Sequence, residues 1–179
     1  MVQERTRMTA DEFFQLPETT QPTELIDGEL IVSPAPILQH QLLVANFHLL
    51  LARLIPNGLI FLSPTDVYFD ETNVPQPDIS WVAENSLCVL AGKRLEGPPD
   101  LILEIFSPGT AKRDKQDKFK LYEKHGVREY WMVDPIQQYL EAWVLVDGRY
   151  SLLGVYGADD IFDSPVLGKV VSLNSIFVS

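Results

Sequence analysis

One short segment in the middle of the chain, Leu101–Phe106, constrains the fold more than any other part of the sequence. It reads Leu-Ile-Leu-Glu-Ile-Phe, so apolar side chains stand at both odd and even positions. Successive side chains of a β-strand point to opposite faces of the sheet, and a strand that is apolar on both parities needs cover on both faces. The segment therefore predicts a central strand inside a layered α/β structure.

The long segment 38–55 predicts a helix that covers one face of this strand. Its apolar residues Leu43, Phe47, Leu50 and Leu54 recur at three- and four-residue steps, which is the period of one helix face. A second, charged helix is expected directly after the central strand, and a left-handed C-cap at Gly126 would end it.

The remaining elements predict the rest of an α/β fold. Thr9 and Glu12 form a capping box for a short helix. We further expect strands at 59–69, 78–83 and 129–133, and hairpins at 24–33 and 139–155. This order indicates a mixed sheet flanked by helices, with additional β-hairpins.

The length of 179 residues fits one domain, 1–179, with a core over about 24–135 and a C-terminal hairpin and tail over 136–179. Cys88 is the one cysteine, which excludes an internal disulfide and favours a reducing compartment. No apolar run is long enough to span a bilayer, and the N-terminal residues are polar. We therefore expect a cytoplasmic protein with no membrane partner.

The charge distribution bears on possible nucleic-acid partners. The chain has 14 Lys and Arg against 25 Asp and Glu, a net charge of −11. Such an acidic total argues against a nucleic-acid binder. Residues 93–128, however, hold nine basic and six acidic residues, a local net charge of +3, while the remainder carries −14. A local basic face can still contact phosphate, with weak and salt-sensitive binding.

Two carboxylates, Asp78 and Glu104, carry the main chemical prediction. Glu104 interrupts the apolar strand, and a buried unpaired carboxylate costs free energy. Asp78 follows Pro77 at the entry of another predicted strand. Taken alone, each has an ordinary alternative: Glu104 as an ion pair at a strand end, and Asp78 as a solvated loop residue. Together, at adjacent strand ends, they form a hard oxygen site for Mg²⁺ that could polarise a phosphodiester.

Lys118 is the third candidate. On the charged helix, Asp114, Lys118 and Tyr122 are spaced four apart and share one face. The helix follows the Glu104 strand directly, so Lys118 could reach back to the carboxylates, orient water or neutralise developing negative charge. A surface Asp114–Lys118 pair is the structural alternative.

Several segments in this order resemble the Uma2 family of the PD-(D/E)XK nuclease superfamily, from Met8 to the tail at 164–168. They are Glu24–Glu29, His40, Gln76–Asp78, Pro99–Glu104, Ser107–Thr110, Asp114, Lys118, Tyr122 and Gly126–Pro135. The resemblance implies a restriction-endonuclease-like fold, and the family's aspartate and glutamate fall on Asp78 and Glu104. The superfamily pattern puts lysine two residues after the glutamate, where this chain has Phe106. The resemblance suggests that Lys118 replaces it.

Four further residues are secondary candidates. Glu29 follows the hairpin turn and could complete a metal shell, although an exposed strand position is an equal alternative. His40, at the start of the long helix, could act as a base or contact DNA, or it could cap or pack. Asp66 could approach the site from its own strand, and Tyr122 shares the face of Lys118.

These residues lead to a metal-dependent deoxyribonuclease that uses Mg²⁺ or Mn²⁺ on DNA. One alternative is a non-catalytic nuclease-like module that binds nucleic acid or a protein, which Phe106 and the acidic total charge favour. Another is a hydrolase that acts on something other than DNA, which the acidic total charge favours. Because cleavage of both DNA strands needs two sites, we also expect a homodimer, with the hairpin around Trp143 as its interface.

Overall fold

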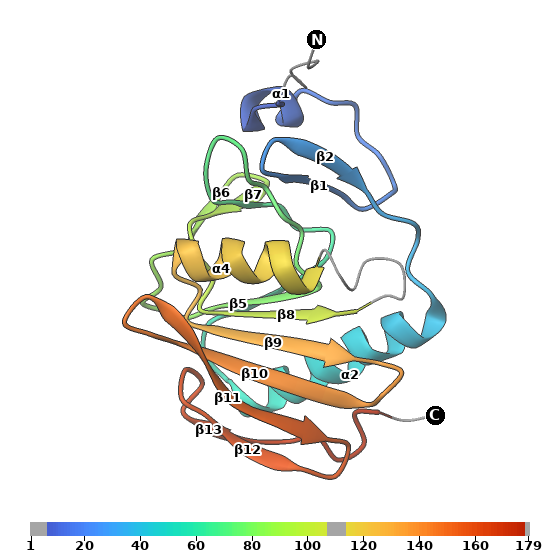
Figure 1. Cartoon of the computed structure of the whole chain (residues 1–179), viewed down its shortest axis with the longest axis vertical. Coiled ribbons are helices and arrows are strands. Elements are labelled where there is room, and N and C mark those ends of the chain that lie inside the picture. Colours follow the sequence, from blue (N-terminus) through green and yellow to red (C-terminus); the bar gives the residue numbers. More distant parts are fainter. Residues whose placement is uncertain (1–6, 107–113, 178–179) are drawn as a thin grey trace.

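The computed structural model describes residues 7–106 and 114–177, with only the backbone of Asp114 and Lys115. Its centre is a six-stranded sheet with the order β11-β10-β9-β8-β5-β3 (Figure 1). Only β8 and β9 are parallel, and every other neighbouring pair in this sheet is antiparallel, which confirms the mixed sheet. The strands are β3 (Leu59–Leu62), β5 (Ile79–Val82), β8 (Leu101–Ile105), β9 (Glu129–Asp134), β10 (Tyr139–Val146) and β11 (Arg149–Gly157).

The central strand β8 is buried along its whole length, as its apolar sequence predicts. Leu101, Leu103 and Ile105 pack on one face into a core that includes helix α2 (Leu38–Leu54). The alternate residue Ile102 packs on the opposite face against helix α4 (Phe119–His125). Because successive side chains alternate, Glu104 lies on the α4 face.

A π-helical turn, η1 (Asp114–Lys118), precedes α4. The predicted helix start at 107–110 lies outside the described residues. Gly126 ends α4 in the left-handed conformation, with φ 86°, which is the predicted C-cap. Lys118 is the last residue of the π turn, and it shares a face with Tyr122 one helical turn later.

Smaller elements surround the sheet. Helix α1 (Ala10–Phe14) has the predicted capping box between Thr9 and Glu12. The small sheets contain β1 (Thr23–Ile26) with β2 (Glu29–Val32), β4 (Val67–Tyr68) with β7 (Arg94–Glu96) and β6 (Val89–Ala91), and β12 (Ile161–Ser164) with β13 (Lys169–Ser172). The hairpins predicted at 24–33 and 139–155 are confirmed, whereas β6–β7 and β12–β13 were not predicted. No helix of the described residues is long and apolar enough to cross a membrane.

The single strand predicted at 59–69 is wrong. Residues 59–62 join the central sheet as β3, and residues 67–68 join a different sheet as β4. Pro64 lies between them, and proline has no backbone N–H to donate to a ladder.

The β1–β2 hairpin is attached to the segment that leads into β5. Leu25 and Val74 exchange both backbone hydrogen bonds, at 3.1 and 2.8 Å. Their side chains also pack together with Ala10 and Phe13 of α1. In Figure 1 the hairpin (blue) therefore lies beyond α4 at one end of the molecule. This attachment carries Glu24 of β1 to the edge where β8 ends.

Candidate active site

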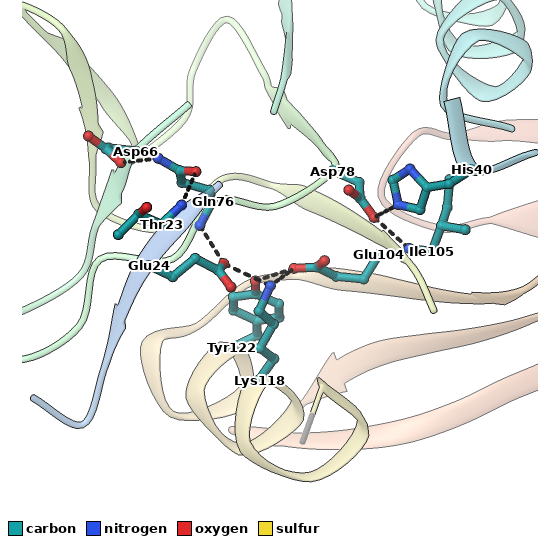
Figure 2. A network of polar contacts seen from close by, with 10 residues as sticks. All are labelled: Thr23, Glu24, His40, Asp66, Gln76, Asp78, Glu104, Ile105, Lys118 and Tyr122. Carbon is teal, nitrogen blue, oxygen red and sulfur yellow. Dashed lines mark hydrogen bonds and ion pairs between the residues drawn. The ribbon is translucent and has the colours of Figure 1, made fainter. Parts of the chain in front are cut away.

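Asp78 and Glu104 lie side by side because β5 and β8 are antiparallel neighbours. Ile79 pairs with Leu103, so the preceding Asp78 lies level with Glu104. The backbone N–H of Ile105 donates a 2.7 Å hydrogen bond to Asp78 Oδ2. The sheet therefore brings the two predicted carboxylates to one edge (Figure 2).

Lys118 points toward these carboxylates. Its Nζ lies 2.9 Å from Glu104 Oε1 and 2.8 Å from Glu24 Oε1, and each of the three side chains is less than a tenth exposed. Lys118 is therefore buried and not a surface residue, while the Asp114 partner of the alternative helix pair has its side chain outside the described residues. The lysine bridges two buried carboxylates that come from separate sheets, β8 and the β1–β2 hairpin.

Tyr122 supports Glu104 from the next turn of α4. Its hydroxyl donates a 2.6 Å hydrogen bond to Glu104 Oε1, the same oxygen that Lys118 contacts. Burial of the ring and the nearby Glu104 charge raise the pKa of Tyr122 well above its usual value. The hydroxyl therefore stays protonated and acts as a fixed donor.

His40 reaches the same edge from the opposite layer. It sits in the first turn of α2, and its Nε2 lies 3.1 Å from Asp78 Oδ2. Burial lowers the pKa of His40, but the hydrogen bond and the charge of Asp78 raise it more, so the net shift is upward. Because a carboxylate only accepts, Nε2 is the donor. His40 therefore orients Asp78 together with the Ile105 N–H.

A second layer of polar contacts fixes Glu24. The backbone N–H of Gln76 donates to Glu24 Oε1 at 2.7 Å. The side-chain Nε2 of Gln76 donates to Asp66 Oδ1 at 2.8 Å. The Thr23 N–H donates to Gln76 Oε1 at 3.3 Å. Burial raises the pKa of Asp66, although the bond from Gln76 opposes the shift. In Figure 2, Asp66 lies on the side of Gln76 that faces away from Glu104, so it supports the site from outside.

The predicted and the observed members of this cluster differ at the hairpin. Glu29 is exposed at the start of β2, and its proposed place in a metal shell stays a prediction. The hairpin carboxylate that contacts Lys118 is instead Glu24, which the sequence reasoning missed. Its signal was a charged residue beside Leu25 and Ile26 in a short strand, the pattern that singled out Glu104. The Asp114 side chain lies outside the described part of the chain.

Comparison with known proteins places the chain in a family. Residues 10–174 match the Uma2 family, which is described as "putative restriction endonuclease". The chain belongs to this family. It is also similar to the uncharacterized protein sll1609 of Synechocystis sp., with 29% identity over 155 residues that cover 82% of this chain and 85% of that protein.

A solved structure supports the fold. It is the crystal structure of a protein from Anabaena variabilis that belongs to DUF820 and is described as a "putative nuclease". The TM-score is 0.77 with 24% sequence identity, and the match covers 95% of this chain and 97% of the other. This likeness confirms the nuclease-like mixed α/β fold predicted for a Uma2 protein.

The donor set at this edge of the Uma2 fold suits a hard divalent cation with water ligands. Among the described residues, no group of three or more His, Cys, Asp and Glu side chains is arranged to hold a metal ion. Mg²⁺ commonly takes only one or two carboxylates and keeps several waters, which a pair such as Asp78 and Glu104 can supply. Both hydrogen bonds to Asp78 end on Oδ2, so Oδ1 keeps lone pairs for another ligand.

The charge balance of this cluster also favours a bound cation. Glu24 and Glu104 flank the ammonium of Lys118, Asp78 lies level with Glu104 on the neighbouring strand, and all three carboxylates have low exposure. Among the described residues, these three carboxylates outnumber the one lysine, and an excess of negative charge is costly in a poorly solvated place. A bound dication would balance it.

Proposed function

We propose that this Uma2 protein is a metal-dependent endonuclease that hydrolyses DNA phosphodiester bonds. The observation that carries the proposal is the meeting of Asp78, Glu104 and Lys118 at one sheet edge, although they come from three different elements. Two carboxylates can hold a metal ion that assists phosphodiester hydrolysis, and a lysine can stabilise the negative charge that develops. This chain has Phe106 where the superfamily pattern has lysine, but Lys118 on the following helix keeps a lysine beside the carboxylates.

Asp78 and Glu104 would hold Mg²⁺ or Mn²⁺. A bound ion would polarise the phosphodiester and lower the pKa of a bound water. The residues of the chain hold these two carboxylates in place: His40 and the Ile105 N–H fix Asp78, and Tyr122 fixes Glu104.

Lys118 would supply positive charge beside the scissile phosphate. Preorganised cations stabilise charge that develops in the transition state, and they act most strongly where water is excluded. Its bond to Glu24 keeps the ammonium at the site from the side opposite Glu104. Glu24 is in this view a positioning residue, since it acts through Lys118.

The DNA partner is supported by the local charge. Residues 93–128 have a net charge of +3, and Lys120, Lys124 and Arg128 in this range are exposed. Because the whole chain carries −11, binding would be weak and would fall steeply with salt. Cys88, a buried free thiol, suits the cytoplasmic location proposed with this activity.

A plasmid-nicking assay tests the proposal. We expect cleavage that requires Mg²⁺ or Mn²⁺ and that is lost in Asp78→Asn, which removes one metal-binding charge while keeping the shape. Asp159→Asn makes the same chemical change in an exposed turn and should cleave at the wild-type rate. Cleavage that survives in Asp78→Asn, or that proceeds equally well in a chelator, would contradict the proposal.

A non-catalytic nuclease-like module is the second candidate. Phe106 occupies the superfamily's lysine position and is buried in the core, and Lys118 is already engaged by two carboxylates. Such a module predicts DNA binding with no cleavage. Fluorescence anisotropy with labelled duplex, run on the same preparations as the nicking assay, separates the two functions.

A further inference from the structure

Helix α2 presents an apolar stripe to solvent on the side away from the core. Its inward residues Leu43, Phe47 and Leu51 are buried. On the outer side Leu38, Leu42 and Leu49 are 79%, 59% and 52% exposed. The alanines at positions 45 and 52 are exposed on the same side. The helix is therefore apolar on two sides, although the described structure covers only one.

The spacing of this outer stripe is that of a helix–helix seam. Its five members, Leu38, Leu42, Ala45, Leu49 and Ala52, follow one another at steps of four, three, four and three. Alternating steps of four and three give an average period of 3.5 residues, which keeps a seam turned toward a partner helix. A period of this kind favours another helix as the covering element.

We propose that this stripe pairs with the α2 helix of a second copy of the chain, antiparallel and around a two-fold axis. In a two-fold contact the same patch must be complementary to itself. An axis through Ala45 sets Leu38 against the partner's Ala52, and Leu42 against the partner's Leu49. Large residues then meet small ones at the ends, and two alanines allow the helices to approach closely at the centre.

The charge of α2 allows a second copy to be the occupant. The chain carries a net charge of −11, so two copies repel each other across most of their surface. Helix α2 has no acidic residue and one basic residue, Arg53. Two copies can therefore meet along α2 without facing acidic groups on that helix.

The neighbouring surface extends the contact. Ile37 precedes the helix and is exposed, and so is Ile136 in the β9–β10 turn. Gln39 Nε2 donates to the Pro135 carbonyl at 3.3 Å, which holds that turn beside the start of α2. The hairpin proposed above as an interface is less suitable, because its Trp143 already packs edge-on against Phe119 at 4.9 Å. The pairing does not depend on the proposed nuclease activity.

Light scattering coupled to size exclusion tests the pairing. We expect the full chain to have the mass of two 20.2 kDa chains, and the double variant Leu42→Glu/Leu49→Glu to have the mass of one. Both positions are exposed, so far-UV circular dichroism should not change. The control Leu87→Glu/Leu90→Glu adds the same charges at exposed positions away from α2 and should stay dimeric. A single-chain wild type, or a dimer that survives in Leu42→Glu/Leu49→Glu, would overturn the proposal.

Oxidative crosslinking tests the antiparallel geometry. Ala45→Cys lies on the proposed axis and should form a disulfide with its own copy, whereas Ala52→Cys would lie too far from its copy. The natural Cys88 is buried, and burial raises its pKa to about 11, so it should not compete. Equal crosslinking of both variants would overturn the antiparallel arrangement. Binding of a monomeric wild type to neutral lipid vesicles would also overturn the proposal, since it would make α2 a membrane-facing helix.

Discussion

Two buried glutamates on neighbouring strands differ in what surrounds them. Glu104 lies near the end of β8, and its partners include the ammonium of Lys118 and the hydroxyl of Tyr122. Glu129 lies at the start of β9, where it is level with Leu101 at the other end of β8. Its donors are neutral: Trp131 Nε1 at 2.7 Å, and the Ser164 hydroxyl and a backbone N–H at 2.8 and 3.0 Å.

The difference separates a structural carboxylate from a candidate catalytic one. Each Glu129 oxygen accepts from fixed neutral groups, and burial, outweighing these hydrogen bonds, raises the pKa of its carboxyl. Glu104 instead shares the ammonium of Lys118 with Glu24 and lies beside Asp78, so carboxylates outnumber cations among the described residues of this group. A buried carboxylate in an apolar strand is therefore not enough to mark a site; a second carboxylate competing for the same cation is the more specific sign.

The largest expected effect is on catalysis. Glu104→Gln should lower the DNA cleavage rate by roughly 10²–10³, because the change would weaken the proposed metal site and remove one charged partner of Lys118. Glu129→Gln makes the same change at the other carboxylate and should cleave at nearly the wild-type rate per folded molecule. Initial nicking rates at one fixed Mg²⁺ concentration give the comparison. Equal losses in the two variants would remove the distinction between the two glutamates.

The second effect is on stability. Lys118→Met should lower the free energy of unfolding by about 3–5 kcal/mol, because it removes the buried ammonium that both Glu24 and Glu104 contact. Urea unfolding measures this loss. Adding Glu24→Gln should recover part of it by removing one of the two charges. A loss below about 1 kcal/mol, as for an ordinary surface pair, would contradict the burial of this cluster.

A smaller loss is expected for Glu129→Gln, about 1–3 kcal/mol by urea unfolding. An amide NH₂ cannot accept, so one of the buried donors around position 129 loses its partner. The matched control is Glu141→Gln in β10, where Glu141 accepts from Trp143 in a similar but only half-buried pair. That change should cost less than about 0.5 kcal/mol. Equal costs would show that burial of Glu129 is not what matters.

The smallest effect concerns pH. The pKa of the Glu129 carboxyl is raised above its ordinary value of 4.5 by burial, so between these two values the folded state binds more protons than the unfolded state. Stability from this group is therefore present below 4.5 and is lost as pH rises through the folded pKa. The free energy of unfolding, measured over a pH series, should fall less steeply with rising pH in Glu129→Gln than in wild type. Parallel curves would contradict the raised pKa.

Much of the fold could be predicted because it depends on local patterns. The apolar strand at 101–106 and the periodic helix at 38–55 each carry a signal within one segment, and the structure confirms both. The strand predicted at 59–69 failed because apolar residues continue on both sides of Pro64 while the chain changes sheets. The hairpins β6–β7 and β12–β13 are short, and each turns at a single glycine with positive φ.

The site was only partly predictable, because it is assembled by long-range packing. Asp78, Glu104 and Lys118 were found since strand order and helix spacing limit where they can lie. Glu24 was missed because the β1–β2 hairpin reaches Lys118 through its backbone pairing with Val74, a contact that no local pattern indicates. Glu129 stands in an apolar strand much as Glu104 does, and only its neighbours distinguish it.

Isothermal titration of Mn²⁺ tests the central claim most directly, because it measures metal binding without a substrate. Wild type and Glu129→Gln should both give a saturable binding heat, whereas Asp78→Asn and Glu104→Gln should each lose most of it. That pattern would assign the metal to the end of the sheet where β5 begins and β8 ends. No binding heat in the wild type, or a heat that is unchanged in Asp78→Asn and Glu104→Gln, would contradict a metal site at these carboxylates.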